Sequence, residues 1–180
     1  MEDLKKKNSP LKDISKSKGN FLENSIINEI LQNIEEIENK CKNSIGEDVV
    51  NMRIKQLTYA KILCNVYGKE LSLLIKAYTC LGCAYLDINY FEQATDHILT
   101  AFKLIQTSVT DNLTLEEKEF QIKVLINLAK CYMEFPDKLA ASLSICEKCL
   151  DLNKKVFGNK HISNSEIYYV LSKVNNYFIK

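Results

Sequence analysis

The chain has 180 residues, of which 46% are hydrophobic and 26% charged, and its formal net charge at pH 7 is +1. This length suits one domain with a hydrophobic core, and the balanced charge gives no global field for nucleic acid or an anionic membrane. With 5 Gly and 2 Pro, the chain lacks the turn residues that strand-rich domains and glycine-lined phosphate sites need. The composition therefore favours an all-α protein that binds neither nucleic acid nor membrane.

The first 20 residues differ in composition from the rest of the chain. Their basic residues are Lys5, Lys6, Lys7, Lys12, Lys16 and Lys18. Such a segment buries too little apolar area to offset the entropy of ordering it, so we expect residues 1–20 to form a flexible basic tail. The sequence shows neither a signal-peptide stretch nor a run of about 18 apolar residues, which predicts a soluble, cytoplasmic protein.

From residue 21 onward, apolar residues recur every three or four positions, which is the pattern of amphipathic helices. In the first of these segments, Gly46 is expected to end the helix. We predict seven helices, at about 21–45, 48–66, 71–87, 90–108, 115–134, 137–156 and 163–179. Short links make neighbouring helices antiparallel. The helical domain would then cover residues 21–180, with hairpins at about 21–66, 70–108 and 114–156 and a terminal helix at 163–179.

An internal repeat runs through these helices. Tyr78-x-x-Leu81-Gly82-x-x-Tyr85 has the same spacing as a later series, which consists of Leu125, Leu128, Ala129 and Tyr132. The following helices align as Ala94-x-x-x-Ile98 and Ala141-x-x-x-Ile145. Small residues at Gly82, Ala94, Ala129 and Ala141 would let paired helices approach closely.

An aromatic residue, Leu-Gly, Tyr and then Ala with a large apolar residue four positions on is the tetratricopeptide pattern, and the chain resembles that family. The links Val66-Tyr67-Gly68 and Val156-Phe157-Gly158 are similar to those of its kinesin-light-chain type, and the stretch 58–106 is similar to ciliary members. The closing proline is absent, and Gln106 and Asn153 stand in its place. The resemblance implies a right-handed α–α superhelix of hairpins whose inner face binds protein.

Two Cys-x-x-Cys pairs, Cys80/Cys83 and Cys146/Cys149, raise the alternative of a zinc site. Zinc pairs usually stand on turns 15–20 residues apart, whereas these pairs fall inside predicted helices and are far apart in sequence. We therefore interpret all seven cysteines as reduced thiols that pack as small apolar residues. No metal ion or cofactor is expected.

Acid–base chemistry has few candidates, because the chain contains two histidines, His97 and His161. No Ser-His-Asp grouping or phosphate loop can be recognised, so no catalytic residue is predicted. The acidic residues Glu35, Glu36 and Glu38 are expected to form the solvated face of the first helix. An enzymatic or zinc-binding protein remains the weakest alternative.

The inner face of a hairpin stack is built from the first helix of each hairpin. Helical spacing from the buried motif places on that face Lys76, Thr79, Cys83, Lys123, Asn127, Lys130, Tyr169 and Lys173, together with Glu166. Four lysines against one glutamate would make the face mildly basic. We expect its ligand to be a protein segment, either an acidic or phosphorylated stretch or an amphipathic helix.

The predicted function is therefore a non-catalytic adaptor or scaffold that holds a partner segment in its concave face. The link type favours a cytoskeletal, motor or ciliary (axonemal) assembly. The alternative is an architectural subunit of a large complex, held through its end or convex surfaces.

Overall fold

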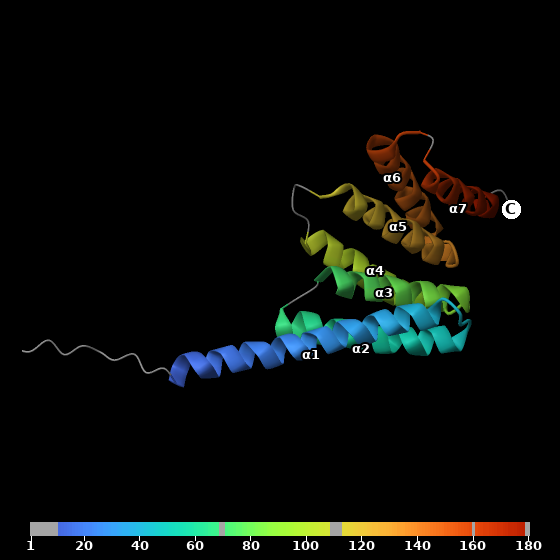
Figure 1. The fold of residues 1–180 in the computed structure, drawn as a ribbon. Coiled ribbons are helices and arrows are strands. Elements are labelled where there is room, and N and C mark those ends of the chain that lie inside the picture. Colours follow the sequence, from blue (N-terminus) through green and yellow to red (C-terminus); the bar gives the residue numbers. More distant parts are fainter. Residues whose placement is uncertain (1–10, 69–70, 109–112, 160, 179–180) are drawn as a thin grey trace, which may run out of the picture.

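The computed structural model describes residues 11–68, 71–108, 113–159 and 161–178, with side chains described from residue 22 to residue 177 of these ranges. This part of the chain is all-α and has no strand (Figure 1). Its elements are α1 (Leu11–Cys41), α2 (Glu47–Tyr67), α3 (Leu71–Asp87), α4 (Phe91–Ser108), α5 (Leu115–Tyr132), the 3₁₀ turn η1 (Pro136–Lys138), α6 (Leu139–Phe157) and α7 (Ser163–Phe178). The predicted all-α class and the seven helices are confirmed.

Successive helices pack against one another in chain order, from the α1–α2 layer to α7 (Figure 1). Contacts also join α3 to α5 and α5 to α7, so the first helices of successive hairpins adjoin. The hydrophobic core is accordingly divided into clusters between layers, as in a helical repeat. None of the described helices has the length and hydropathy that a membrane span requires.

The first helix differs from the prediction at both ends. It begins at Leu11 instead of residue 21, so residues 11–20 are helical where the sequence predicted a tail, while residues 1–10 of that tail lie outside the described residues. No proline interrupts the helix between Leu11 and Cys41. Its one glycine, Gly19, lowers the helix propensity by about 1 kcal/mol relative to alanine, which does not end the helix. The helix ends at Cys41, and Gly46, with φ of 65°, stands at the start of α2.

Glycine is required where α3 crosses α4. A Cβ atom at Gly82 would lie 3.2 Å from the carbonyl oxygen of Ala94 and closer still to the Ile98 side chain. Ala94 and Ile98 are themselves fully buried. The close approach predicted at Gly82 is therefore confirmed for this hairpin.

In the third hairpin, α5–α6, the structure shifts the predicted alignment by one residue. Ala141 is exposed, and Ser142 takes the buried place, where its hydroxyl donates to the carbonyl oxygen of Ala129 at 2.7 Å. The buried series of α4 (Ala94, Ile98, Ala101 and Ile105) therefore corresponds to Ser142, Cys146, Cys149 and Asn153. The shift arises because the α5–α6 connection contains the turn Pro136–Lys138, whereas α3–α4 turns tightly at Asn89, where φ is 63°.

Candidate partner-binding groove

A cavity with a volume of about 820 Å³ lies between α1, α2, α3 and α5. Its lining comes from α1, the α1–α2 turn, α2, α3, the α3–α4 link and α5. The apolar lining consists of Cys41, Ile45, Val49, Cys80, Cys83, Ala84, Ile88 and Phe120, and the charged lining of Glu38, Arg53, Lys76, Asp87 and Lys123. We call this cavity the first pocket.

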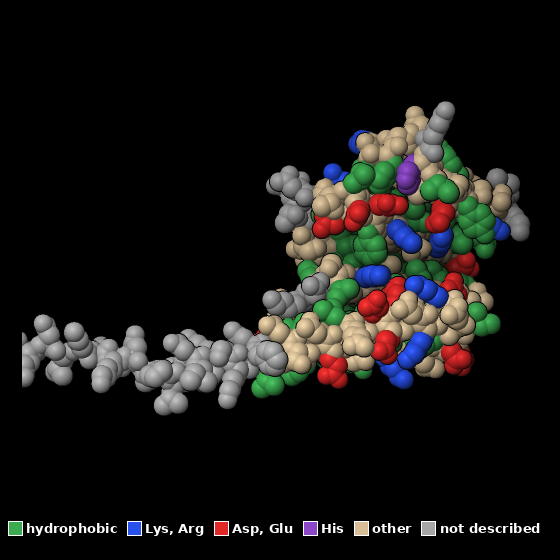
Figure 2. Space-filling model, in the orientation of Figure 1, with side chains coloured by type: hydrophobic (Ala, Val, Ile, Leu, Met, Phe, Trp, Pro, Cys, Tyr) green, Lys and Arg blue, Asp and Glu red, His purple; other side chains and the backbone are tan. Residues whose placement is uncertain are grey.

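A second pocket of about 330 Å³ lies between α5 and the start of α7. Its lining includes Glu119, Ile122, Lys123, Ile126, His161, Ile162 and Glu166. Lys123 lines both pockets, so the two are neighbours along the face formed by α1, α3, α5 and α7, and together we call them the inner groove. On this face, acidic and basic side chains surround a recess that contains apolar ones (Figure 2).

The eight side chains predicted to form the groove fall into three groups. Lys76, Thr79, Cys83 and Lys123 line the first pocket, although Thr79 is only 4% exposed and its hydroxyl donates to Ile75 in its own helix. Asn127 is 6% exposed, and its amide donates to the Cys83 sulfur at 3.2 Å. Asn127 is therefore buried beneath the groove surface, where it holds Cys83 in place and is not exposed to a ligand.

The remaining three predicted residues line neither pocket. The Lys130 ammonium is 3.2 Å from a carboxylate oxygen of Glu166, which joins α5 to α7. Lys173 lies 5.6 Å from the ring centroid of Tyr169, and both side chains are exposed on α7. The predicted Tyr169 and Lys173 are thus close to each other but apart from the pocket linings.

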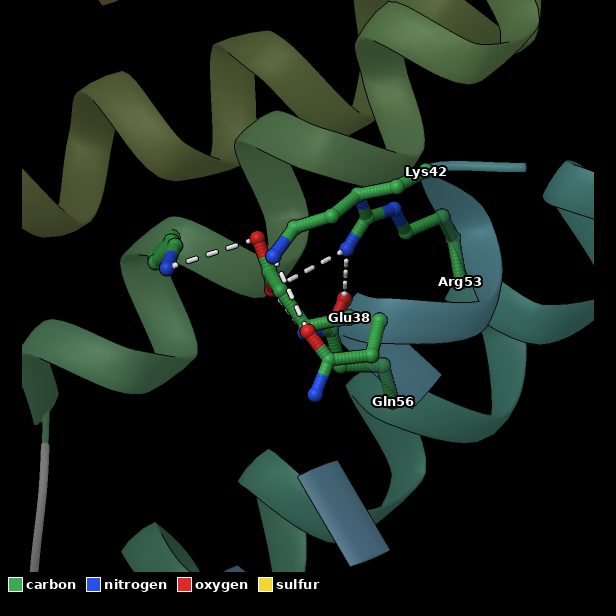
Figure 3. Close-up of polar contacts among 6 residues, drawn as sticks. Glu38, Lys42, Arg53 and Gln56 are labelled. Atoms are coloured by element: carbon green, nitrogen blue, oxygen red, sulfur yellow. Dashed lines mark hydrogen bonds and ion pairs between the residues drawn. The ribbon is translucent and has the colours of Figure 1, made fainter. Parts of the chain in front are cut away.

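Glu38 is the centre of a polar cluster at the edge of the first pocket (Figure 3). One of its carboxylate oxygens accepts from the Arg53 guanidinium at 3.2 Å and from the Gln56 amide at 2.9 Å, and the other lies 3.6 Å from the Lys76 ammonium. Arg53 also donates to the Gln56 side-chain oxygen at 2.7 Å. The cluster joins α1, α2 and α3, so the expectation that Glu38 belongs to a solvated face is wrong.

The pKa of Glu38 is lowered below its ordinary value of 4.5. Burial is the largest single influence and raises the pKa, but the Gln56 hydrogen bond and the charges of Lys76 and Arg53 together outweigh it. Because the folded-state pKa is lowered, the stabilisation is present above pH 4.5 and is lost as the pH falls through the folded-state value.

Replacing Glu38 with glutamine should therefore lower the free energy of unfolding at pH 7 by about 1 kcal/mol, because partly buried Arg53 loses its counter-charge. Urea denaturation from pH 7 to pH 3 measures the effect, and the difference from the parent should shrink below pH 4.5. The control is Glu35→Gln, which changes an exposed carboxylate of the same helix. A pH-independent difference would contradict the role assigned to the Glu38 charge.

The charge of the groove also differs from the expected basic face. Its lining carries three basic side chains, Arg53, Lys76 and Lys123, against four acidic ones, Glu38, Asp87, Glu119 and Glu166. Arg53 and Lys76 both pair with Glu38. Lys123 takes part in none of the ion pairs found among the described side chains, so it is the basic side chain of this lining that has no carboxylate partner there.

The two cysteine pairs lie in different parts of the fold. Cys80 and Cys83 line the first pocket, whereas Cys146 and Cys149 belong to the cluster between α5, α6 and α7. Burial raises the pKa of Cys83 to about 11 and that of Cys149 to about 12. Thiols with these pKa values are protonated at neutral pH and are weak nucleophiles. Among the described side chains, no group of three or more metal-binding residues is found.

Helical spacing missed three features of the site. Ile45 and Ile162 stand in loops, where no periodicity reports exposure, and they are 89% and 82% exposed. Glu38 lies one turn after buried Ile34, beside the apolar stripe of α1, which was a signal in the sequence for partial burial. These residues complete a groove that spans the layers of a helical-hairpin stack. No protein-family model and no curated protein matched the chain.

Proposed function

We propose that this protein is a non-catalytic scaffold that binds a segment of a partner protein in the inner groove. In this proposal the hairpins are of the tetratricopeptide type and wind into a right-handed superhelix, which makes the groove face concave. The observation that carries the proposal is the first pocket, a cavity of about 820 Å³ with apolar and charged side chains from α1, α2, α3 and α5 in its lining. A cavity of this kind suits side chains of a bound segment better than it suits solvent.

Two exposed isoleucines support the same face. Ile45 belongs to the first pocket and Ile162 to the second, and they have the highest exposed fractions among the large hydrophobic side chains described. Burying such a side chain contributes about 1.5–3 kcal/mol, so a partner that covers both gains substantial affinity.

Replacing Ile45 and Ile162 together with serine should reduce capture of the partner from native-cell extract at least about tenfold, because two apolar contacts are lost. Helix content and melting should stay close to the parent, since exposed substitutions usually change stability by less than about 0.5 kcal/mol. The full chain is the bait, and the abundance of co-purifying proteins is measured by quantitative mass spectrometry.

The matched control is Val66→Ser, which removes an aliphatic side chain that is 69% exposed but lines neither pocket. Capture that is lost equally in the control and in the groove variant would count against the groove. Capture that is unchanged in both the control and the groove variant would also count against the groove.

The second candidate function, an architectural subunit held through its end, is favoured by α7. Tyr168 and Tyr177 on this helix are 51% and 56% exposed, while Val174 is fully buried. A change at Val174 would therefore disturb the core, whereas Tyr168→Ser with Tyr177→Ser tests the outer surface alone. The architectural function would be favoured if the two tyrosine substitutions released the protein from its assembly while the Ile45→Ser/Ile162→Ser variant stayed bound.

The links that end in Gly68 and Gly158 support a context for the scaffold. They resemble those of kinesin-light-chain repeats, and Gly68 has the left-handed backbone that such a helix end uses. We propose on this basis a cytoplasmic protein of the cytoskeleton, of motors or of cilia. Imaging the full chain with a fluorescent tag in its native cell tests this proposal, and a diffuse signal away from filaments and cilia would contradict it.

A further inference from the structure

We propose that the inner groove selects a partner segment in which one acidic residue stands between two large apolar residues. The inference rests on the proposed function and specifies the chemistry of the ligand. Three features carry it: an apolar site at each end of the groove, one available cation between them, and carboxylates that disfavour further acidic residues.

The apolar sites are separate and each has an exposed isoleucine. In the first pocket, Ile45 shares the lining with the apolar side chains of Ile88 and Phe120. In the second pocket, Ile162 lies with Ile122 and Ile126, which are 1% and 3% exposed and form its floor. Each pocket can therefore cover one large apolar side chain of a bound segment.

The cation between these sites is Lys123. It lines both pockets, so a segment that fills both must pass its ammonium group. The other basic groups nearby already have ion-pair partners, because Arg53 and Lys76 share the carboxylate of Glu38 and Lys130 pairs with Glu166. A carboxylate of the partner thus gains most from Lys123, where it does not have to displace a carboxylate of this chain.

Carboxylates of the chain limit the acidic character of the ligand. Asp87 lines the first pocket, and Glu119 and Glu166 line the second. Glu119 lies one turn before Lys123 on α5 and forms no ion pair with it. Its negative charge reduces the area of positive potential around Lys123. A second acidic residue beside either apolar anchor would meet like charge, so the groove disfavours an acidic run or a phosphorylated residue.

The test is selection of a random twelve-residue peptide display library on the full-length protein. Enriched peptides should carry one Asp or Glu between two large apolar residues. Synthetic copies should bind Lys123→Glu about tenfold more weakly, and the loss should decrease at high salt. Binding to Lys148→Glu, an exposed change on α6 outside both pockets, should equal binding to the parent. Selection on Lys123→Glu should instead enrich Lys or Arg at the central position.

The other outcomes separate this inference from the proposed function. Peptides that lose binding to the Ile45→Ser/Ile162→Ser variant but show no acidic preference would overturn the inference and leave the groove function intact. Preference for acidic runs, or for a phosphorylated copy of the peptide, would also overturn the inference. Peptides that bind the groove variant as well as the parent, or a selection without enrichment, would count against both.

Discussion

Replacing Gly82 with leucine should lower the free energy of unfolding by about 1–3 kcal/mol, because the added side chain overpacks the contact between α3 and α4. Even a Cβ atom at this position approaches the Ala94 carbonyl oxygen to 3.2 Å and the Ile98 side chain more closely. The backbone oxygen cannot move without displacing α4, so the strain is not relieved by a rotamer change. The gain in helix propensity over glycine, about 1 kcal/mol, is too small to offset it.

Thermal and urea denaturation followed by circular dichroism measure this effect. The matched control is Ala141→Leu on α6, where the residue is exposed and the change should stay within about 0.5 kcal/mol. A Gly82→Leu variant that melts like the parent would refute the close crossing of α3 and α4. A large loss in the control would refute the corrected register of α6.

Replacing Asn153 with leucine should have an effect of similar size, about 1–3 kcal/mol, because its buried partners lose their hydrogen bonds. Asn153 is fully buried; its amide donates to Asn164 at 2.7 Å, and its oxygen accepts from the Ser163 hydroxyl at 3.0 Å. The Asn164 amide in turn donates to the carbonyl oxygen of Asn159 at 3.0 Å. The network holds the α6–α7 link, which carries Ile162 and hence one end of the groove.

Chemical denaturation of the single variants and of Asn153→Leu/Asn164→Leu measures the coupling. Each single variant leaves the remaining asparagine without its hydrogen-bond partner, whereas the double variant removes both asparagines. The double variant should therefore lose less stability than the sum of the two single losses. Asn175→Leu, at an exposed position of α7, should be close to neutral. Additive losses would mean that the two asparagines do not act as a pair.

The helices could be predicted from the sequence because their burial follows local periodicity. Gly82 could be assigned to a helix crossing because the repeat puts small residues at Gly82 and Ala94. The register of α6 could not be predicted from the sequence. It depends on the geometry of the turn Pro136–Lys138, and no periodicity encodes that geometry. The buried role of Asn153 was hidden likewise, since its partners Ser163 and Asn164 stand at the start of α7.

The groove could be predicted in part. Lys76, Cys83 and Lys123 were placed on one face by helical spacing, and all three line the first pocket. Spacing within one helix cannot report which charges another helix neutralises, so the ion pairs made by Glu38 and Glu166 were not foreseen. For this reason the face appeared more basic in the sequence than it is in the fold.

The most direct test of the scaffold proposal is photo-crosslinking from the groove. A photoreactive phenylalanine analogue is introduced at Ile45 in one full-length variant and at Tyr177 of α7 in another, and each is irradiated in native-cell extract. A partner held in the groove should be crosslinked from position 45 and not from position 177, and excess groove-binding peptide should abolish the product. Crosslinking of the partner from position 177 alone would contradict the groove and favour an architectural subunit held by α7.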